Sequence, residues 1–142
     1  MNKSNIYRES LLEHVRNPRN LGSIDDPDLK AYVYNHLCGD ELELNIDLSE
    51  GKIKDCKTKV RGCSICLASA SMMTELIILK SLKEVSNISK DFSKCLKNGY
   101  CKIPKYLKNL VPLISLKEHK SRIKCISLAW DALADCLNKL EK

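Results

Sequence analysis

Aromatic side chains are scarce in this sequence of 142 residues, at 5% of the total. Proteins that bind RNA or DNA usually combine a basic stripe with interleaved aromatic residues. The 24 lysines and arginines outnumber the 18 aspartates and glutamates, for a net charge of +6, but they are scattered along the chain. Scattered charge is typical of a solvated surface. We therefore expect no nucleic-acid partner.

Long apolar runs are also missing. The N-terminal stretch MNKSNIYRESLLEHVRNPRN lacks the apolar core of a secretory signal. No later stretch reaches the run of about 20 apolar residues that crosses a bilayer. We therefore expect no membrane association and a cytoplasmic location.

Neither an internal repeat nor a low-complexity linker interrupts the chain. A length of 142 residues suits one domain with a sizeable core. We expect residues 1–142 to form a single domain, present as a monomer or a weak oligomer.

Cysteine, in contrast, is abundant. The eight cysteines occupy positions 38, 56, 63, 66, 95, 101, 125 and 136. In the cytosol such residues serve more often as free thiols or metal ligands than as a disulfide framework. We therefore expect some of these thiols to act together.

Apolar periodicity predicts an α+β fold. Ser4 can cap a first helix that ends before Asn17-Pro18. The expected elements are a helix over 4–16, strands over 30–37, 42–48 and 53–60, and helices over 63–79, 83–97, 105–110 and 126–140. Short turns join the strands, so we expect a three-stranded antiparallel sheet packed by helices on one face.

Three cysteines stand at the edges of these elements. Cys38 lies in the turn between the first two strands, whereas Cys63 and Cys125 each precede a helix. A thiol at a helix N-terminus feels the partial positive charge of unpaired N–H groups, which lowers its pKa. In Cys38-Gly39-Asp40, glycine permits a tight turn that directs a thiolate and a carboxylate to one cation. Three thiolates and the Asp40 carboxylate predict a tetrahedral zinc or iron site.

Several motifs stand in one order along nearly the whole chain. They are HVRNPRN at 14–20, Cys38-Gly39-Asp40, Gly62-Cys63-Ser64-Ile65, ASASMMTE at 68–75, and Arg122-Ile123-Lys124-Cys125 followed by Leu128-Ala129-Trp130. This set resembles the SufU branch of the U-type iron–sulfur cluster assembly proteins, which are relatives of the IscU and NifU scaffolds. The resemblance implies a SufU/IscU-like fold, with metal ligands at Cys38, Asp40, Cys63 and Cys125.

Lys124, directly before Cys125, bears on the branch of that family. IscU-type scaffolds have histidine there, whereas SufU-type proteins resemble this chain in having lysine. SufU-type proteins also carry an insertion before the last helix, and the stretch 80–122 is long enough to contain it. Both features favour the SufU branch, and with it zinc as the cofactor.

The resemblance implies a sulfurtransferase that acts with a cysteine desulfurase of the SufS type. Cys38 would accept the persulfide sulfur and pass it toward cluster-assembly proteins or apo iron–sulfur proteins. An alternative function is a scaffold that holds iron or a transient 2Fe–2S cluster on Cys38, Cys63 and Cys125 and delivers it to apo-proteins. A third is a zinc-stabilised interaction module without sulfur chemistry.

Cys66 creates a Cys63-x-x-Cys66 spacing, which is also found in redox pairs and zinc knuckles. Serine is usual at this position in the family that the chain resembles. We interpret Cys66 as a small core-facing side chain, with metal binding as the alternative. Cys136 is also expected to face the core, and the remaining cysteines have no assigned role.

The three histidines complete the set of potential ligands. His36 and His119 lie close in sequence to the first and last site cysteines, so each is an alternative metal ligand or proton carrier. We favour a bystander role for both. His14 is expected to lie at the surface or to cap the first helix.

Overall fold

The computed structural model describes residues 3–99 and 101–140 of the chain. The elements are α1 Lys3–Arg16, β1 Leu29–Tyr34, β2 Glu41–Ser49, β3 Lys52–Arg61, α2 Ser64–Ile77, α3 Leu82–Lys97, the 3-10 helix η1 Lys105–Leu110, α4 Val111–Ile114 and α5 Lys120–Leu140. This order confirms the expected α+β fold.

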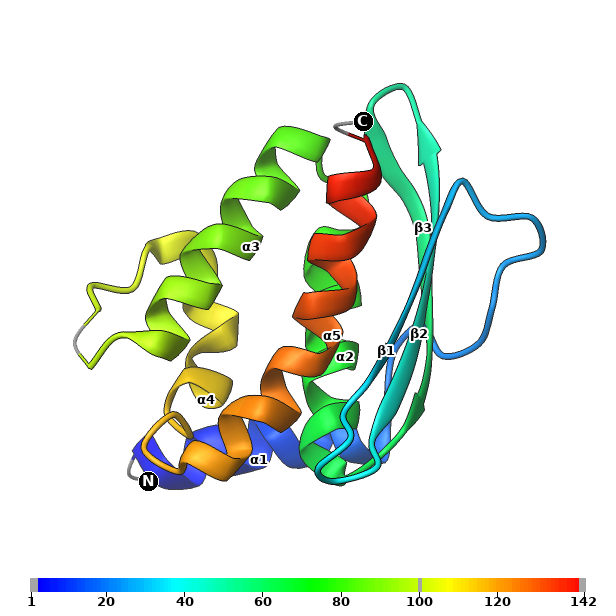
Figure 1. Cartoon of the computed structure of the whole chain (residues 1–142). Helices are drawn as coiled ribbons and strands as arrows, with labels where there is room; N and C mark the ends of the chain where they lie inside the picture. Colours follow the sequence, from blue (N-terminus) through cyan, green and yellow to red (C-terminus); the bar gives the residue numbers. More distant parts are fainter. Residues whose placement is uncertain (1–2, 100, 141–142) are drawn as a thin grey trace.

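The three strands form one antiparallel sheet with β2 in the middle. Leu42, Leu44 and Ile46 of β2 are fully buried, because alternate residues of a strand point to the same face. Figure 1 shows the helices on one side of the sheet, with α2 and α5 next to it. The expected packing of helices on a single face is confirmed.

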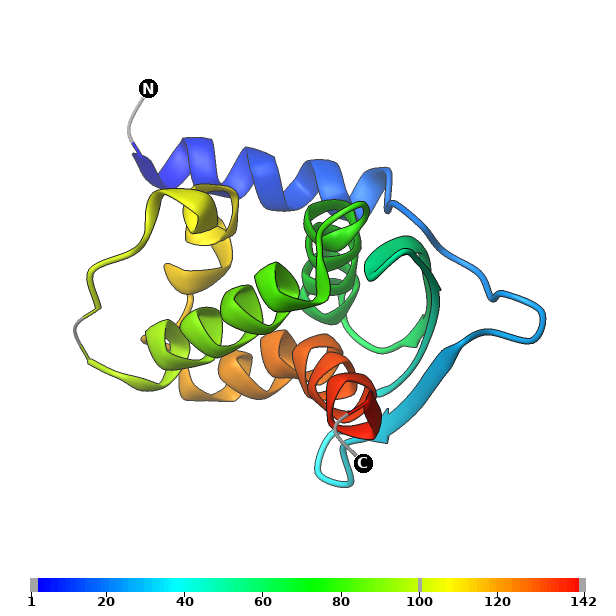
Figure 2. The same ribbon diagram turned by 90° about the horizontal axis from the view of Figure 1, so that it is seen from above.

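Close packing between α2 and α5 fixes the position of α5. Ser69 of α2 donates a hydrogen bond to the carbonyl of Ile126 at 2.7 Å and accepts one from Trp130 Nε1 at 3.2 Å. On the other side, Phe92 of α3 packs against the Trp130 ring, with the two centroids 4.4 Å apart. α5 therefore packs against both α2 and α3, and Figure 2 shows the three helices from above.

Two expected boundaries near the N-terminal half are wrong. Ser4 lies inside α1 rather than at its cap. β1 ends at Tyr34 rather than at residue 37, because a turn follows in which the Gly39 N–H donates to the Asn35 carbonyl at 2.8 Å. The turn therefore begins three residues earlier than the apolar pattern indicates.

The start of α5 also differs from the expectation. The helix begins at Lys120, six residues before the start of the apolar stripe at 126. Its first turn is polar and exposed, including Ser121 and Arg122, so it contributes no apolar periodicity. Cys125 therefore lies within the helix and not before it.

One pair of cysteines is disulfide-bonded, whereas the sequence favours free thiols or metal ligands over disulfides. Cys95, near the end of α3, is joined to Cys101, six positions later. The Lys117 ammonium donates to the carbonyls of Cys95 and Asn98 at 3.2 and 3.1 Å. The disulfide therefore joins the C-terminal part of α3 to the segment that leads to η1.

The helices also bear on membrane association. Over residues 3–99 and 101–140, none of them is long and apolar enough to cross a bilayer.

Candidate metal centre

Three chain segments meet at one end of the sheet: the β1–β2 turn, the start of α2 and the first half of α5 (Figure 1). The turn supplies Asp40, α2 and its cap supply Cys63 and Cys66, and α5 supplies Cys125. One ligand atom from each of these four residues lies within 4.8 Å of the others. We call these residues the four-donor group.

The Asp40 carboxylate is central to this arrangement. Its Oδ2 accepts hydrogen bonds from the thiols of Cys38 at 3.0 Å and Cys66 at 3.2 Å, and the Cys125 thiol lies 4.0 Å from it. The sulfurs of Cys63 and Cys66 are 3.6 Å apart. In a tetrahedral zinc site, with Zn–S bonds of about 2.3 Å, two sulfurs lie about 3.8 Å apart. The donor atoms therefore fit a zinc ion after small adjustments, with loss of the thiol protons on binding.

Cys38 adjoins the four-donor group but is not part of it. Its thiol contacts Asp40, yet the residue is exposed, on a turn in which Gly39 has a φ of 74°. This backbone conformation favours glycine, which has no side chain to clash there. The hydrogen bond to the Asp40 carboxylate raises the pKa of Cys38. The structure thus brings the four residues predicted from the sequence to one place, with Cys38 on its outer edge.

Cys66 is the residue that the sequence interpretation underestimates. It is only 1% exposed, as expected of a core-facing side chain, but its sulfur points to Asp40 rather than into purely apolar surroundings. Cys63 is the N-cap residue of α2 and Cys66 is the third residue of the helix, so both sulfurs lie at its N-terminal end. The Cys63-x-x-Cys66 spacing is the sequence feature that indicates Cys66 as a member of the four-donor group.

The pKa values of the clustered thiols diverge. Burial is the largest influence on Cys63, but the nearby N–H of Cys66 and the thiols of Cys125 and Cys66 outweigh it and lower the pKa of Cys63. Burial raises the pKa of Cys66, and burial together with Cys63 raises the pKa of Cys125 to about 11. Cys63 caps α2, whereas Cys125 lies in the second turn of α5. The expected lowering by a helix N-terminus is confirmed for Cys63 and wrong for Cys125.

Gly62 leaves room for the Asp40 carboxylate. A Cβ atom at position 62 would lie 3.0 Å from Asp40 Cγ and Oδ1. This separation is shorter than an ordinary van der Waals contact, so Asp40 would have to move by a few tenths of an ångström. The glycine before Cys63 therefore helps to position the carboxylate as well as the thiol.

Replacing Gly62 by alanine should weaken zinc binding about tenfold, because displacing a supporting contact of a metal ligand typically costs that much or more. Competition with a chelator measures the affinity. Gly99→Ala is the matched control, since an added Cβ there meets nothing within 4 Å. Equal zinc affinity in the two variants would mean that the Asp40 position does not matter for the metal.

The histidines near the cysteines do not join the four-donor group. His36 is exposed and makes an edge-to-face contact with Tyr34, with ring centroids 4.8 Å apart. His119 lies directly before α5 and is exposed. Arg122 and Lys124, in the first turns of that helix, are exposed too. The structure therefore favours the bystander interpretation for both histidines.

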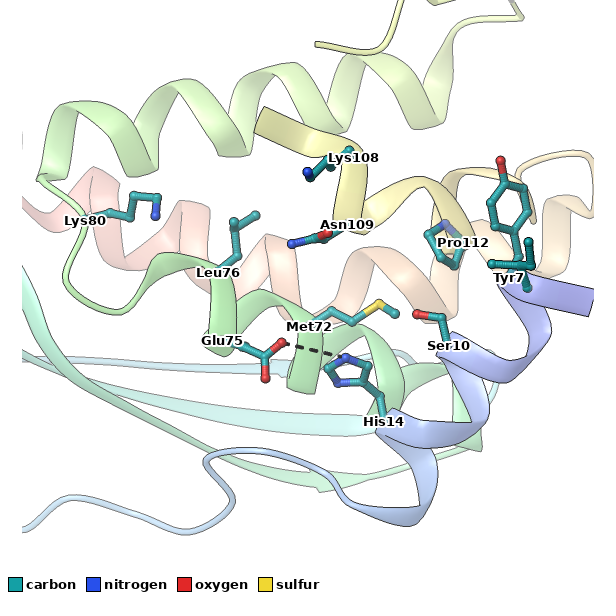
Figure 3. Close-up of a pocket in the computed structure, with 11 residues that line it drawn as sticks. Tyr7, Ser10, His14, Met72, Glu75, Leu76, Lys80, Lys108, Asn109 and Pro112 are labelled. Atoms are coloured by element: carbon teal, nitrogen blue, oxygen red, sulfur yellow. Dashed lines mark ion pairs between the residues drawn. The ribbon is translucent and has the colours of Figure 1, made fainter. Parts of the chain in front are cut away.

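His14 is buried, which corrects the expectation of a surface or capping role. Its Nδ1 hydrogen-bonds with Ser71 Oγ at 2.7 Å, and its Nε2 lies 3.9 Å from Glu75 Oε1. Figure 3 shows His14 beside a cavity of about 600 Å³ between α1, α2 and the η1–α4 segment. None of the residues that line this cavity belongs to the four-donor group. His14 therefore docks α1 onto α2, away from the cysteines.

The free energy of unfolding should decrease as the pH falls, because His14 becomes protonated more readily in the unfolded chain. Burial and the Arg19 charge lower the pKa of His14 below its ordinary value of 6.5, against a smaller effect of Glu75. The unfolded chain then binds the proton more readily, so this stability is present above about pH 6.5 and is lost as pH falls below it. Urea unfolding at pH 7.5 and 5.5 should give a smaller difference for His14→Gln than for the wild type. Exposed His36→Gln is the control; identical differences in the two variants would contradict the assignment.

Comparisons with known proteins extend these observations. The sequence model of the NifU-like N terminal domain family matches residues 6–142. The chain is 34% identical over 140 residues to the zinc-dependent sulfurtransferase SufU of Bacillus subtilis (strain 168), a match that covers 99% of this chain and 95% of that protein. It is 31% identical over 137 residues to the iron–sulfur cluster assembly scaffold protein IscU of Thermotoga maritima, with 96% of each chain covered.

Solved structures agree with the sequence matches. The crystal structure of the N-terminal part of a nitrogen-fixing NifU-like protein from Brucella abortus superposes with a TM-score of 0.86 at 25% identity, covering 97% of this chain and 96% of that one. The similarity thus extends over the whole sheet and its helices and is not confined to the cysteine motifs.

Proposed function

Since this chain belongs to the NifU-like N-terminal domain family, which serves iron–sulfur cluster assembly, we propose that it is a zinc-dependent sulfur acceptor. Residues 1–142 act as a single U-type domain. Cys38, Asp40, Cys63 and Cys125 hold the zinc, and Cys38 receives sulfur from the persulfide of a cysteine desulfurase.

The position of Cys38 carries this proposal. Its thiol is exposed on a glycine turn, whereas its neighbours Asp40 and Cys66 are buried. An acceptor must reach the sulfur of another protein, and among the cysteines near Asp40 only Cys38 is exposed. Cys63 and Cys125 stand on α2 and α5, which the core packing holds in place. The site therefore combines donors on packed helices with one accessible thiol, that of Cys38.

The transfer itself is a thiol–persulfide exchange. The Cys38 thiolate attacks the terminal sulfur of the desulfurase persulfide, the sulfur–sulfur bond in the desulfurase breaks, and the desulfurase cysteine leaves as a thiolate. Cys38 then carries the new persulfide, and no external oxidant or reductant is consumed. Bound zinc would keep the coordinated sulfurs deprotonated at neutral pH, although the free thiols of Cys38 and Cys125 have raised pKa values.

The surface beside Cys38 suits a protein partner. Leu37 is 79% exposed, and the turn borders a groove of about 380 Å³ that Lys124 also lines. An exposed leucine next to an exposed thiol and a basic side chain offers apolar and charged contacts together. We infer that the desulfurase docks over this turn. The cytoplasmic location and the absence of nucleic-acid and membrane partners stay predictions.

Labelled sulfur tests the proposal. The purified protein should contain one zinc and, with a cysteine desulfurase and 35S-labelled L-cysteine, should acquire label on the peptide that contains Cys38. Peptide mapping under non-reducing conditions identifies the labelled cysteine. Label on another cysteine would contradict the acceptor assignment, and failure to take up sulfur from any desulfurase would favour a zinc-stabilised interaction module.

The alternative is a scaffold for a transient 2Fe–2S cluster that is delivered to apo-proteins. The similarity to the Thermotoga maritima scaffold protein favours it, as does a donor set that iron accepts as readily as zinc. Metal analysis and anaerobic reconstitution with iron and sulfide separate the two functions. Stoichiometric zinc without a stable visible absorbance supports sulfur transfer, whereas a reconstituted cluster that moves to an apo-ferredoxin supports the scaffold.

A further inference from the structure

The four-donor group is complete without Cys38. We propose that Cys66 is the zinc ligand that takes the place of Cys38 while Cys38 carries sulfur. This inference rests on the proposed function, because it concerns what happens to the metal when the acceptor leaves it. It assigns a coordinating role to a residue that the sequence alone favours as part of the core.

The position of the Cys66 sulfur supports this role. It lies 3.2 Å from Asp40 Oδ2 and 3.6 Å from the Cys63 sulfur, and it shares the 4.8 Å limit with Cys125. The group thus offers three sulfurs and one carboxylate oxygen, which is a full set for tetrahedral zinc. Cys38 is therefore a fifth donor beside a set of four that can bind zinc without it.

The two interchangeable cysteines differ in how they are held. Cys66 lies in the first turn of α2, is 1% exposed and packs with the core. Cys38 lies on an exposed turn whose geometry depends on Gly39. A ligand that must leave the metal and return is better placed on a turn than on a packed helix. Cys66 can therefore bind the metal when Cys38 moves out.

A replacement ligand has a clear consequence for the metal. If Cys38 left without one, Asp40, Cys63 and Cys125 would remain, and the open fourth position would admit water or a competing ligand. Cys66 is already within reach, so its thiol needs only to lose its proton to the metal and rotate slightly. The protein would then retain its zinc through the sulfur-carrying state without help from a partner.

Cobalt substitution tests the exchange directly. Replacing Cys38 by serine imitates the state in which this ligand is withdrawn, and the intensity of the sulfur-to-cobalt charge-transfer bands reports the number of coordinated thiolates. We expect three thiolates in Cys38→Ser and two in Cys38→Ser/Cys66→Ser. Zinc binding should be about 100-fold weaker in the double variant than in the single one. Cys38→Ser/Cys136→Ser is the control, because Cys136 is also a buried helical cysteine but lies outside the four-donor group.

Two thiolates in Cys38→Ser alone would overturn the inference, even if the double variant failed to fold. A third thiolate in that variant points to Cys66, because Cys56 and Cys136 are buried outside the four-donor group and Cys95 is bonded to Cys101. Failure of the proposed function looks different: the wild-type protein would then bind no zinc or would take up no sulfur. Both results can be read from the same preparations.

Discussion

Replacing Cys38 by serine should reduce desulfurase-dependent sulfur uptake by at least about 1000-fold, the scale on which removal of a reacting nucleophile acts. A serine hydroxyl is not ionised at neutral pH and cannot form the persulfide, so the reacting atom itself is lost. The same variant should still bind one zinc, because Cys66 can take the place of Cys38 and complete the four-donor group. Loss of sulfur uptake with retained metal separates the acceptor role from the ligand role. Incorporation of 35S and metal analysis of the same sample measure both.

Cys56→Ser is the control for this variant, because Cys56 is a buried cysteine of β3 outside the four-donor group. It should take up sulfur at the wild-type rate. A Cys38→Ser protein that accepted sulfur normally would exclude Cys38 as the acceptor. Attention would then turn to Cys63 and Cys125, the two thiols of the four-donor group that are not fully buried.

Removing both Cys63 and Cys125 should weaken zinc binding by about 100-fold or more. A structural zinc site of four ligands contributes about 10–16 kcal/mol, or roughly 2.5–4 kcal/mol for each ligand. With both residues changed to serine, only Cys38, Asp40 and Cys66 remain as donors near the site. Zinc then has at most three protein ligands in place of four, whether Cys38 or Cys66 binds it in the wild type. A loss of about 2.8 kcal/mol corresponds to a 100-fold weaker affinity.

Chelator competition gives the zinc affinity of this double variant, and thermal unfolding with and without zinc gives an independent measure. Binding to the folded state raises its stability, so the wild type should gain more from added zinc than the variant. Cys56→Ser/Cys136→Ser is the control, since it also removes two free thiols, in this case buried ones of β3 and α5 that lie outside the four-donor group. If both double variants bound zinc equally well, the metal would have to lie elsewhere in the chain.

Much of the fold could be predicted from apolar periodicity. The alternation from Leu42 to Leu48 predicts the central strand, and in the structure Leu42, Leu44 and Ile46 are fully buried under the helices. The stripe that includes Ile126 and Trp130 likewise predicts the main part of α5. Boundaries failed where the signal is not periodic, as in the polar first turn of α5. The apolar periodicity arises because one face of an element is buried, so exposed turns such as this one do not show it.

The candidate site was predicted in its members more accurately than in its arrangement. Cys38, Asp40, Cys63 and Cys125 were identified through motif positions, and the β1–β2 turn, α2 and α5 do bring them together. The sequence did not indicate that Cys66 lies with these residues, or that Cys38 lies at the exposed edge of the site. A cysteine at a helix-spaced position is compatible with either a core contact or a ligand, because both require the same buried face.

The order of the elements, the family and the candidate metal and sulfur residues follow from the sequence alone, since they depend on local periodicity and on motifs along the chain. Which of these donors lie at one point depends on the packing of the folded chain. The distances between Asp40 and the sulfurs of Cys66 and Cys125 join residues 26 and 85 positions apart. Such distances are set by the packing of α2 and α5 on the sheet, where many weak contacts act together and no single segment encodes the result.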